Sequence, residues 1–290
     1  MKKFAVIDIG SNSVRLMFVA DGKVLYKTLQ TTRLGQGLAT SKQLQADAIE
    51  RSATAVAEFV AQAKTDGAER TVAFATAAVR SATNGQTFVD RVFALCGLNV
   101  EVIAGETEAE LGILGALGNG DGFVVDVGGA STEIVGRVRG EMVYKKSVDV
   151  GVVRLKDVCG RDRVALRQYA KTAVKAYGTI PMVGKTYAIG GTATTLAALV
   201  LGLTEYSSER VTGTVLTVET MQTMADKLLE MTVEEIAALP CMPSGRADVL
   251  AGGAVWLAVL MQELGILEIT VSDRDNLEGY AIRRGWMESV

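Results

Sequence analysis

Two short segments of this chain combine an aspartate, a glycine turn and small hydroxyl residues. The first is Asp8-Ile9-Gly10-Ser11-Asn12-Ser13, and the second is Asp126-Val127-Gly128-Gly129-Ala130-Ser131-Thr132. In each, an apolar run ends at the aspartate and a second apolar run follows the hydroxyl residues. Glycine lets the backbone approach an anion closely and point several N–H groups at it. The pattern therefore predicts two phosphate-binding turns, whose donors would be Gly10, Ser11, Asn12, Ser13, Gly128, Gly129, Ser131 and Thr132.

Carboxylates beside these turns are candidates for binding a divalent metal. Mg²⁺ usually keeps several waters and takes only one or two carboxylates from the protein. Asp8 and Asp126 fit that role, with Mn²⁺ as the alternative ion. A strand-end aspartate can also be a plain turn-former, but its repetition at equivalent points favours metal binding. Glu133 follows the second turn, where it either holds a metal-bound water or a Ser/Thr hydroxyl, or is an exposed strand residue.

The amino-acid composition excludes several classes of catalytic mechanism and partner. The chain has 290 residues, which is enough for two lobes, and 49% of them are apolar, which argues against disorder. Histidine is absent, so Ser-His-Asp catalysis, Cys-His catalysis and histidine-bound zinc are excluded. Three separated cysteines indicate a reduced, cytoplasmic protein. A net charge of −3 gives no sign of a nucleic-acid partner, and the uncharged stretches 186–204 and 249–262 do not suit membrane spans.

The apolar patterns predict an α/β chain in which one order of elements occurs twice. Strands are expected over 4–8, 14–20, 23–28, 71–75 and 99–103, with helices over 44–64, 85–96 and 106–117. In the second half, strands are expected over 122–126, 131–138, 142–148, 185–189 and 267–271, with helices within 151–176, over 192–200, near 217–229, over 232–238, 246–263 and 276–286. This repetition predicts two lobes, 1–117 and 118–290, joined at the glycine-rich segment 118–122. The C-terminal segment 276–290 is a candidate for crossing back onto the first lobe.

Seven motifs in this order resemble the exopolyphosphatase / guanosine pentaphosphate phosphohydrolase (Ppx/GppA) family. They lie at 8–15, 33–37, 75–84, 105–109, 126–133, 190–192 and 246–250. The resemblance covers nearly the whole chain and implies two actin-like (ribonuclease H-like) lobes, each with a mixed five-stranded sheet, around an interdomain cleft. The chain departs from the family at Ala130, which replaces a glycine, at Thr107, which replaces a glutamate, and at 276–279, which lacks an arginine.

The resemblance also assigns roles to further residues. It places the catalytic glutamate, which orients or deprotonates the attacking water, at Glu108; otherwise this residue would only favour the N-terminus of its helix. Arg80 is expected to reach the scissile phosphate, since arginine binds phosphate with a two-pronged guanidinium. Arg15 is a weaker phosphate candidate, because it could also be an outward strand residue. Gly190, Gly191 and Thr192 would form a third phosphate turn.

The expected function is Mg²⁺-dependent hydrolysis of the terminal phosphoanhydride of inorganic polyphosphate, releasing orthophosphate. The alternative substrate is guanosine pentaphosphate. Two other classes stay open: an actin-like kinase, and a nucleotide- or alarmone-binding regulator without turnover. The family also suggests a homodimer.

A basic stripe lies outside these motifs. Arg163, Arg167, Lys171 and Lys175 recur every four residues and would share one helix face. Such a stripe is either an ordinary solvated face or a track for the tail of a polyphosphate chain.

Overall fold

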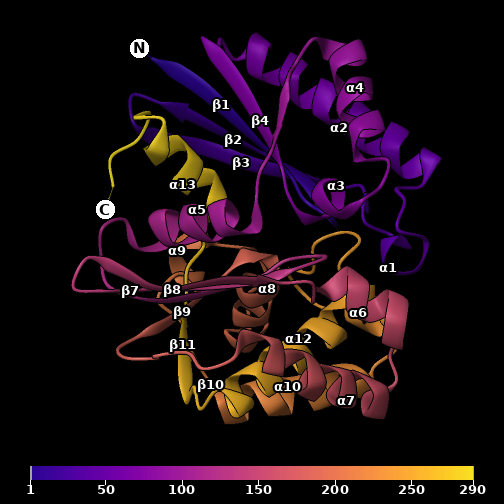
Figure 1. Ribbon diagram of the computed structural model, residues 1–290, viewed down its shortest axis with the longest axis vertical. Coiled ribbons are helices and arrows are strands. Elements are labelled where there is room, and N and C mark those ends of the chain that lie inside the picture. Colours follow the sequence, from indigo (N-terminus) through magenta and orange to yellow (C-terminus); the bar gives the residue numbers. More distant parts are fainter. Residues whose placement is uncertain (1, 290) are drawn as a thin grey trace.

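The computed structural model describes residues 2–289 as two α/β lobes stacked on one another (Figure 1). The first lobe contains a five-stranded sheet in the order β3-β2-β1-β4-β5. Its strands are β1 (Lys3–Ile9), β2 (Ser13–Ala20), β3 (Lys23–Thr31), β4 (Arg70–Ala75) and β5 (Val100–Val102). Strand β1 is antiparallel to β2 and parallel to β4, so the sheet is mixed.

Helices cover one face of this first sheet. The long ones are α2 (Ala46–Thr65) and α4 (Gly85–Cys96), and the short ones are α1 (Leu38–Ser41) and α3 (Ala77–Ser81). Buried side chains of α2 and α4, including Phe59 and Phe88, form one apolar core with strand residues such as Ile7 and Leu16.

The second lobe repeats the plan with a larger sheet in the order β10-β11-β9-β6-β7-β8. Its strands are β6 (Gly122–Val127), β7 (Thr132–Val138), β8 (Glu141–Val148), β9 (Thr186–Ile189), β10 (Val215–Thr217) and β11 (Glu268–Val271). Its helices are α6 (Val152–Cys159), α7 (Arg163–Val174), α8 (Gly190–Val200), α9 (Ser208–Val211), α10 (Val218–Glu230), α11 (Val233–Ala237) and α12 (Ala247–Glu263). A single 3₁₀ turn, η1 (Lys175–Tyr177), follows α7. The sheet has one strand more than expected, because β10 adds a three-residue antiparallel edge to β11.

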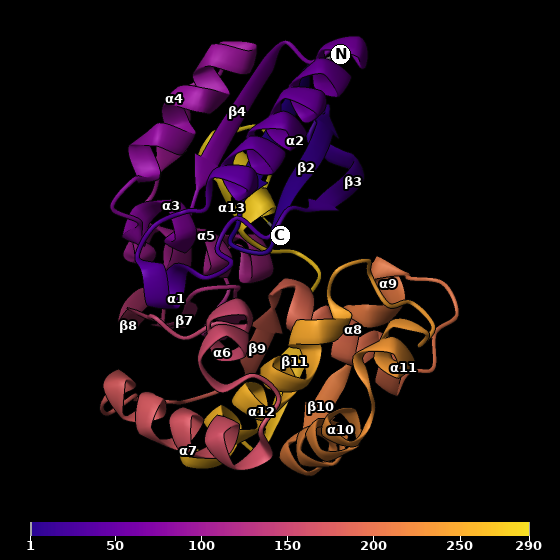
Figure 2. The ribbon, with the colours of Figure 1, turned by 90° about the vertical axis from the view of Figure 1, so that its right-hand side faces the viewer.

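Two helices lie between the sheets. Helix α5 (Gly105–Leu117) packs Leu111 against the first sheet and Ile113 against the second. Helix α13 (Asn276–Arg283) lies beside α5 (Figure 2), and its Leu277 and Tyr280 pack on the first sheet. Helix α13 of the second half of the chain therefore packs on the first lobe.

The sheets direct the glycine turns toward one another. In an open α/β sheet, ligands bind outside the carboxyl ends of the parallel strands. Asp8 stands opposite Arg15 at the carboxyl end of β1, and Asp126 stands opposite Glu133 at the carboxyl end of β6. Within residues 2–289, no helix is long and apolar enough to cross a lipid bilayer.

Candidate functional site

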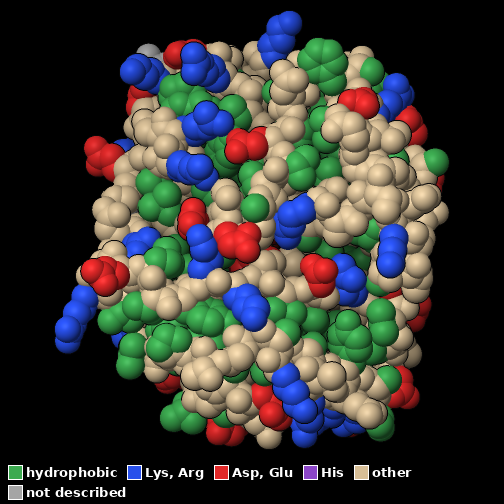
Figure 3. Space-filling model, viewed as in Figure 1, with side chains coloured by type: hydrophobic (Ala, Val, Ile, Leu, Met, Phe, Trp, Pro, Cys, Tyr) green, Lys and Arg blue, Asp and Glu red, His purple; other side chains and the backbone are tan. Residues whose placement is uncertain are grey.

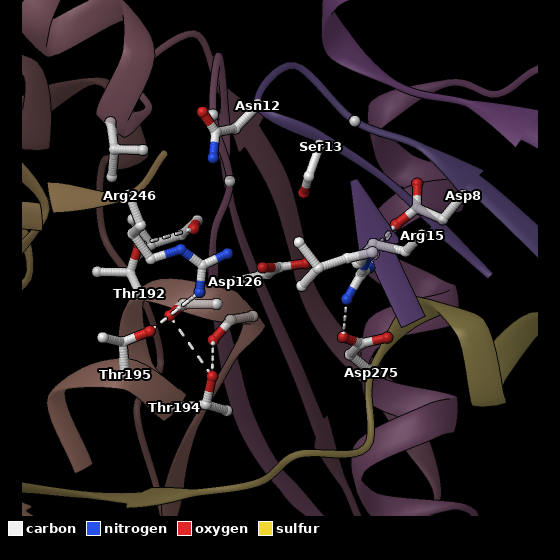
Figure 4. A pocket seen from close by; sticks show the side chains of 18 of the residues that line it. Asp8, Asn12, Ser13, Arg15, Asp126, Thr192, Thr194, Thr195, Arg246 and Asp275 are labelled. Atoms are coloured by element: carbon white, nitrogen blue, oxygen red, sulfur yellow. Dashed lines mark hydrogen bonds and ion pairs between the residues drawn. The ribbon is translucent and has the colours of Figure 1, made fainter. Parts of the chain in front are cut away.

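A cavity of about 480 Å³ lies between the lobes, and Figure 4 shows its interior. It is lined by all three predicted turns, by the helix residue Glu108 and by residues of the last helix. The lining includes Asp8, Gly10, Ser11, Asn12, Ser13, Arg15, Asp126, Gly128, Gly129, Ser131, Gly190, Gly191 and Thr192. Segments that are far apart in the sequence therefore meet at one site.

The first turn is braced by the loop after β3. The amide of Gly35 donates to the carbonyl of Ser11 at 2.8 Å, and the amide of Arg33 donates to the carbonyl of Asn12 at 2.8 Å. A Cβ at Gly35 would lie 2.8 Å from the Ser11 Cβ, so only glycine lets the two segments approach this closely. The motif at 33–37 thus supports the first turn.

The second turn is braced by the start of α6. The amides of Val152 and Val153 donate to the carbonyls of Gly128 and Gly129 at 3.0 and 2.8 Å. These helix N–H groups would otherwise have no partner within the helix. They are used to fix the turn. Within the turns, the amide of Gly128 donates to the Ser131 carbonyl and the amide of Gly10 donates to the Ser13 carbonyl, both at 3.0 Å, so these two predicted phosphate donors are used by the turns themselves.

The two turns are in contact. A Cβ at Gly129 would lie 2.7 Å from the Ser11 Cβ, so a larger residue would push the turns apart. The predicted arrangement, with one turn from each lobe facing the other, is present in this structure.

Glu108 lies in the first turn of α5 and in the cavity wall, and it is only 6% exposed. Burial raises the pKa of its carboxyl to about 7, and the neighbouring Arg80 opposes that rise. Arg80 Nη1 donates to Glu108 Oε2 at 3.0 Å and to the Ile103 carbonyl at 2.9 Å. Arg80 was expected to reach the scissile phosphate. In the structure its guanidinium instead binds Glu108, and Arg80 is not among the residues that line the cavity.

Arg15 bridges two carboxylates from opposite ends of the chain. Its guanidinium is ion-paired with Asp8 and with Asp275, as the dashed lines in Figure 4 show. Asp275 also caps α13 by accepting a hydrogen bond from the Leu277 amide at 3.0 Å. We did not select Asp275 from the sequence, although an aspartate three residues before Glu278 is a capping-box pattern.

Asp126 is held by the same helix. Asn276 Nδ2 donates to Asp126 Oδ2 at 3.0 Å. Burial is the main cause that raises the pKa of Asp126 to about 7. Asn276 is a second site residue that we did not select from the sequence.

The structure corrects two predictions at the end of the second turn. The Thr132 hydroxyl donates to the Val150 carbonyl at 2.5 Å and accepts from Trp256 Nε1 at 2.8 Å. It is fully buried in the second lobe, so we assign it to the core and not to phosphate binding. Glu133 is likewise buried outside the cavity lining, and its Oε1 accepts hydrogen bonds from Ser131 and Ser147. This placement fits the expectation that Glu133 holds a hydroxyl, whereas an exposed strand position and direct metal binding do not fit it.

The third turn begins α8. Gly190 has a φ of +82°, and a Cβ there would lie 2.6 Å from Asp126 Oδ1, so glycine is required. Arg246 covers Gly191, donating to its carbonyl at 2.6 Å and to Thr195 Oγ1 at 3.0 Å. Arg246 forms no ion pair with any acidic residue in the range 2–289, although it lines the cavity. The motif at 246–250, which contains Arg246, could be recognised in the sequence, but the position of Arg246 in the cavity wall could not be predicted.

The cavity suits a hydrated cation. Its lining holds more acidic than basic side chains: Asp8, Glu108, Asp126, Asp273 and Asp275 against Arg15, Lys27 and Arg246. Asp8 Oδ1 is buried without a hydrogen-bond partner. Across residues 2–289, no three acidic or cysteine side chains converge into a closed metal cage. This donor set fits Mg²⁺, which keeps most of its waters.

The basic stripe is an ion-pair network between helices. Arg163 and Arg167 on α7 both bind Asp226 on α10, at 2.6 and 2.8 Å. Both helices lie at the end of the second lobe away from the cavity (Figure 1). Two of the four charges are thus compensated within the protein, which argues against a substrate track on this face. On the face in Figure 3, acidic and basic side chains are interspersed.

Comparisons with known proteins agree with this architecture. Exopolyphosphatase 2 of Mycobacterium tuberculosis is 34% identical over 314 aligned positions, which cover 97% of this chain and 98% of that protein. The guanosine-5′-triphosphate,3′-diphosphate pyrophosphatase of Aeromonas hydrophila is 29% identical over 97% of this chain and 58% of its own length. The crystal structure of the Aquifex aeolicus member of the Ppx/GppA family superposes with a TM-score of 0.79 at 29% identity, covering 98% of this chain and 97% of that one. The profile of the Ppx/GppA phosphatase family matches residues 16–285, and the chain therefore belongs to that family.

Proposed function

We propose that this phosphatase hydrolyses the terminal phosphoanhydride of inorganic polyphosphate and releases orthophosphate. The observation that carries the proposal is Glu108: a buried carboxyl with a raised pKa in the wall of a cavity lined by three glycine turns. A general base is most effective when its pKa is near the working pH. The full-length match to a protein named exopolyphosphatase favours polyphosphate as the first substrate.

In the proposed mechanism, a water molecule attacks the terminal phosphorus in line with the bridging oxygen. Glu108 accepts the water proton, the new P–O bond forms, and the bridging P–O bond breaks. The products are orthophosphate and a chain shorter by one phosphate. Backbone N–H groups of the three turns that are not already hydrogen-bonded within their turn would stabilise the charge on the equatorial oxygens.

Several groups have supporting roles in this proposal. Arg80 would orient the Glu108 carboxylate, and Arg246 would offset substrate charge. Arg15, whose charge is used by Asp8 and Asp275, would hold these carboxylates in place rather than bind phosphate. Asp8 and Asp126 would hold Mg²⁺, or Mn²⁺ as the alternative, which would supply charge neutralisation for the phosphates. A cytoplasmic location and a homodimer stay part of the proposal.

Guanosine pentaphosphate is the second candidate substrate. The second-lobe side of the cavity presents the side chains of Cys241, Met242, Pro243 and Leu250 beside Arg246. These groups would suit the nucleoside of such a substrate better than a bare phosphate chain. The Aeromonas hydrophila relative carries a name of this type, although the chain spans about three-fifths of its length.

Parallel assays separate the candidates. Orthophosphate release is measured from long-chain polyphosphate and from guanosine pentaphosphate, with Mg²⁺, with Mn²⁺ and with EDTA. Release from polyphosphate that EDTA abolishes supports the proposal, and release from the nucleotide alone supports the second candidate. ADP formation from ATP that depends on an added sugar or glycerol would instead indicate a kinase. Nucleotide binding without any phosphate release would indicate a regulator.

A further inference from the structure

Ser147 lies where the second sheet meets the helix that carries Glu108. It is half-buried near the end of β8, the edge strand next to β7. A Cβ at Gly105, the first residue of α5, would lie 2.6 Å from the Ser147 Cβ. Gly105 therefore allows α5 to rest directly on Ser147, three residues before Glu108. Contact at this point fixes the start of α5 against the second lobe.

The Ser147 hydroxyl also holds a buried carboxylate. Ser147 Oγ donates to Glu133 Oε1 at 2.6 Å, and Ser131 Oγ donates to the same oxygen at 2.7 Å. Glu133 is 2% exposed, and its Oε2 has no hydrogen-bond partner. Two hydroxyl donors on one oxygen are therefore the polar contacts that hold this carboxylate in place.

Ser131 connects this cluster to the cavity. Its hydroxyl hydrogen is used by Glu133, so Ser131 can donate to a phosphate only through its backbone amide. Movement of Glu133 would release the Ser131 hydroxyl and alter the second turn. Ser147 therefore holds Glu133, Glu133 holds the Ser131 hydroxyl, and Ser131 lines the cavity.

The charge around Glu133 makes its position sensitive to lost donors. Burial raises the pKa of Glu133 well above its ordinary value, and the nearby Glu108 and Asp126 raise it further. The hydroxyl hydrogen bonds from Ser147 and Ser131 oppose this rise, so removing either donor takes away part of what holds the carboxyl in place.

We propose that Ser147 is a positioning residue: it holds Glu133 at the junction of β7, β8 and α5, and so fixes the Ser131 hydroxyl and the placement of Glu108. Ser147 does not line the cavity and touches no reacting atom. The inference rests on the proposed function for its kinetic test, but its geometric content is independent of the substrate.

The kinetic test uses Ser147→Ala with polyphosphate and Mg²⁺. Loss of a residue that orients others typically costs about 10- to 100-fold, so we expect kcat to fall by at least about tenfold while KM stays within about twofold. Ser147→Thr keeps the hydroxyl and should recover most of the activity. Lys146→Ala, at the exposed neighbouring position, is the matched control and should match wild type. Thermal unfolding of each variant shows whether a loss reflects unfolding.

A crystal structure of Ser147→Ala gives the second readout, which needs no turnover. We expect the Glu133 carboxylate to leave hydrogen-bond distance of Ser131 Oγ. An unmoved Glu133 together with wild-type kcat would overturn the inference. If the wild-type protein releases phosphate from neither substrate, the proposed function fails, and the position of Glu133 in the variant still decides whether Ser147 holds it.

Discussion

The central residue-scale feature is a carboxyl that burial shifts toward neutral pH. Removing Glu108 from water disfavours its charged form, and Arg80 at 3.0 Å only partly restores that form. The result is a pKa of about 7 in place of an ordinary glutamate value of 4.5. Such a group is about half ionised at pH 7 and yet basic enough to take a proton from water.

A pH profile tests this shift. Because the raised pKa leaves Glu108 protonated below about 7, kcat/KM for polyphosphate should fall as the pH drops through 7, approaching a tenfold loss per unit. Steady-state assays between about pH 5.5 and 8.5 measure this fall. Glu106→Gln, which changes an exposed carboxyl on the same helical turn, should leave the profile unchanged. A wild-type profile that is flat down to about pH 5.5 would show that Glu108 is not the titrating base.

Sequence and structure differ at single residues for a physical reason. The glycine turns and Glu108 are visible in the sequence because local backbone chemistry determines them. Asp275 and Asn276 are not, since they reach Arg15 and Asp126 across 260 and 150 positions. Thr132 was wrong as a phosphate donor because a partner 124 residues away, Trp256, engages its hydroxyl. Side-chain direction at the end of a strand depends on such distant contacts.

At the scale of elements, α5 and α13 lie so close together that the packing of these two helices determines where some site residues are placed. A Cβ at Gly115 would overlap the Asp275 carbonyl oxygen, and one at Gly279 would overlap the Leu111 carbonyl oxygen. Asp275 and Asn276 begin α13, so this approach also places the partners of Arg15 and Asp126. Both glycines are helical, where glycine is otherwise unfavourable by about 1 kcal/mol.

Substituting Gly115 should therefore cost stability. Gly115→Ala is expected to lower the free energy of unfolding by about 3 kcal/mol or more, because a methyl group must displace backbone. Gly252→Ala in α12 is the matched control: its Cβ would meet Leu166 Cδ2 at an ordinary 3.7 Å, so we expect a gain of about 0.5–1 kcal/mol. Urea denaturation measures both, and equal stabilities for the two variants would refute the packing argument.

The long elements could be predicted from the sequence, whereas several of the shortest could not. The helical period identifies α2, α4, α10 and α12, because each is long enough to display a face. Elements α1, α3, α9 and β10 have three to five residues, so no period is visible in them. The sixth strand of the second sheet was missed for this reason.

On the scale of the whole molecule, ion pairs and hydrogen bonds join the lobes on the side where α1 meets α6 (Figure 2). Arg33 of the first lobe binds Asp248 of α12 at 2.8 Å, and Lys156 binds the same carboxylate. The amide of Gly37 donates to Asp157 Oδ2 at 2.9 Å. These contacts fix the lobes in the arrangement that places the two turns against each other.

Weakening this contact should shift the protein toward an open state. Arg33→Ala removes one partly buried ion pair, worth about 1 kcal/mol, so we expect a larger radius of gyration in solution scattering and an approximately fivefold change in KM. Arg91→Ala breaks an exposed pair with Glu50 inside the first lobe and serves as the control. Identical scattering curves for Arg33→Ala and wild type would contradict a closing role for the Arg33–Asp248 pair.

The most direct test of the account is phosphate release by Glu108→Gln. Glutamine keeps the shape of the side chain but cannot accept the water proton, so release from polyphosphate should fall by about 10²- to 10⁴-fold at an unchanged unfolding temperature. Glu110→Gln, which removes an exposed carboxylate paired with Lys145, should retain wild-type turnover. Retention of turnover within about threefold by Glu108→Gln would contradict the assignment of Glu108 as the base.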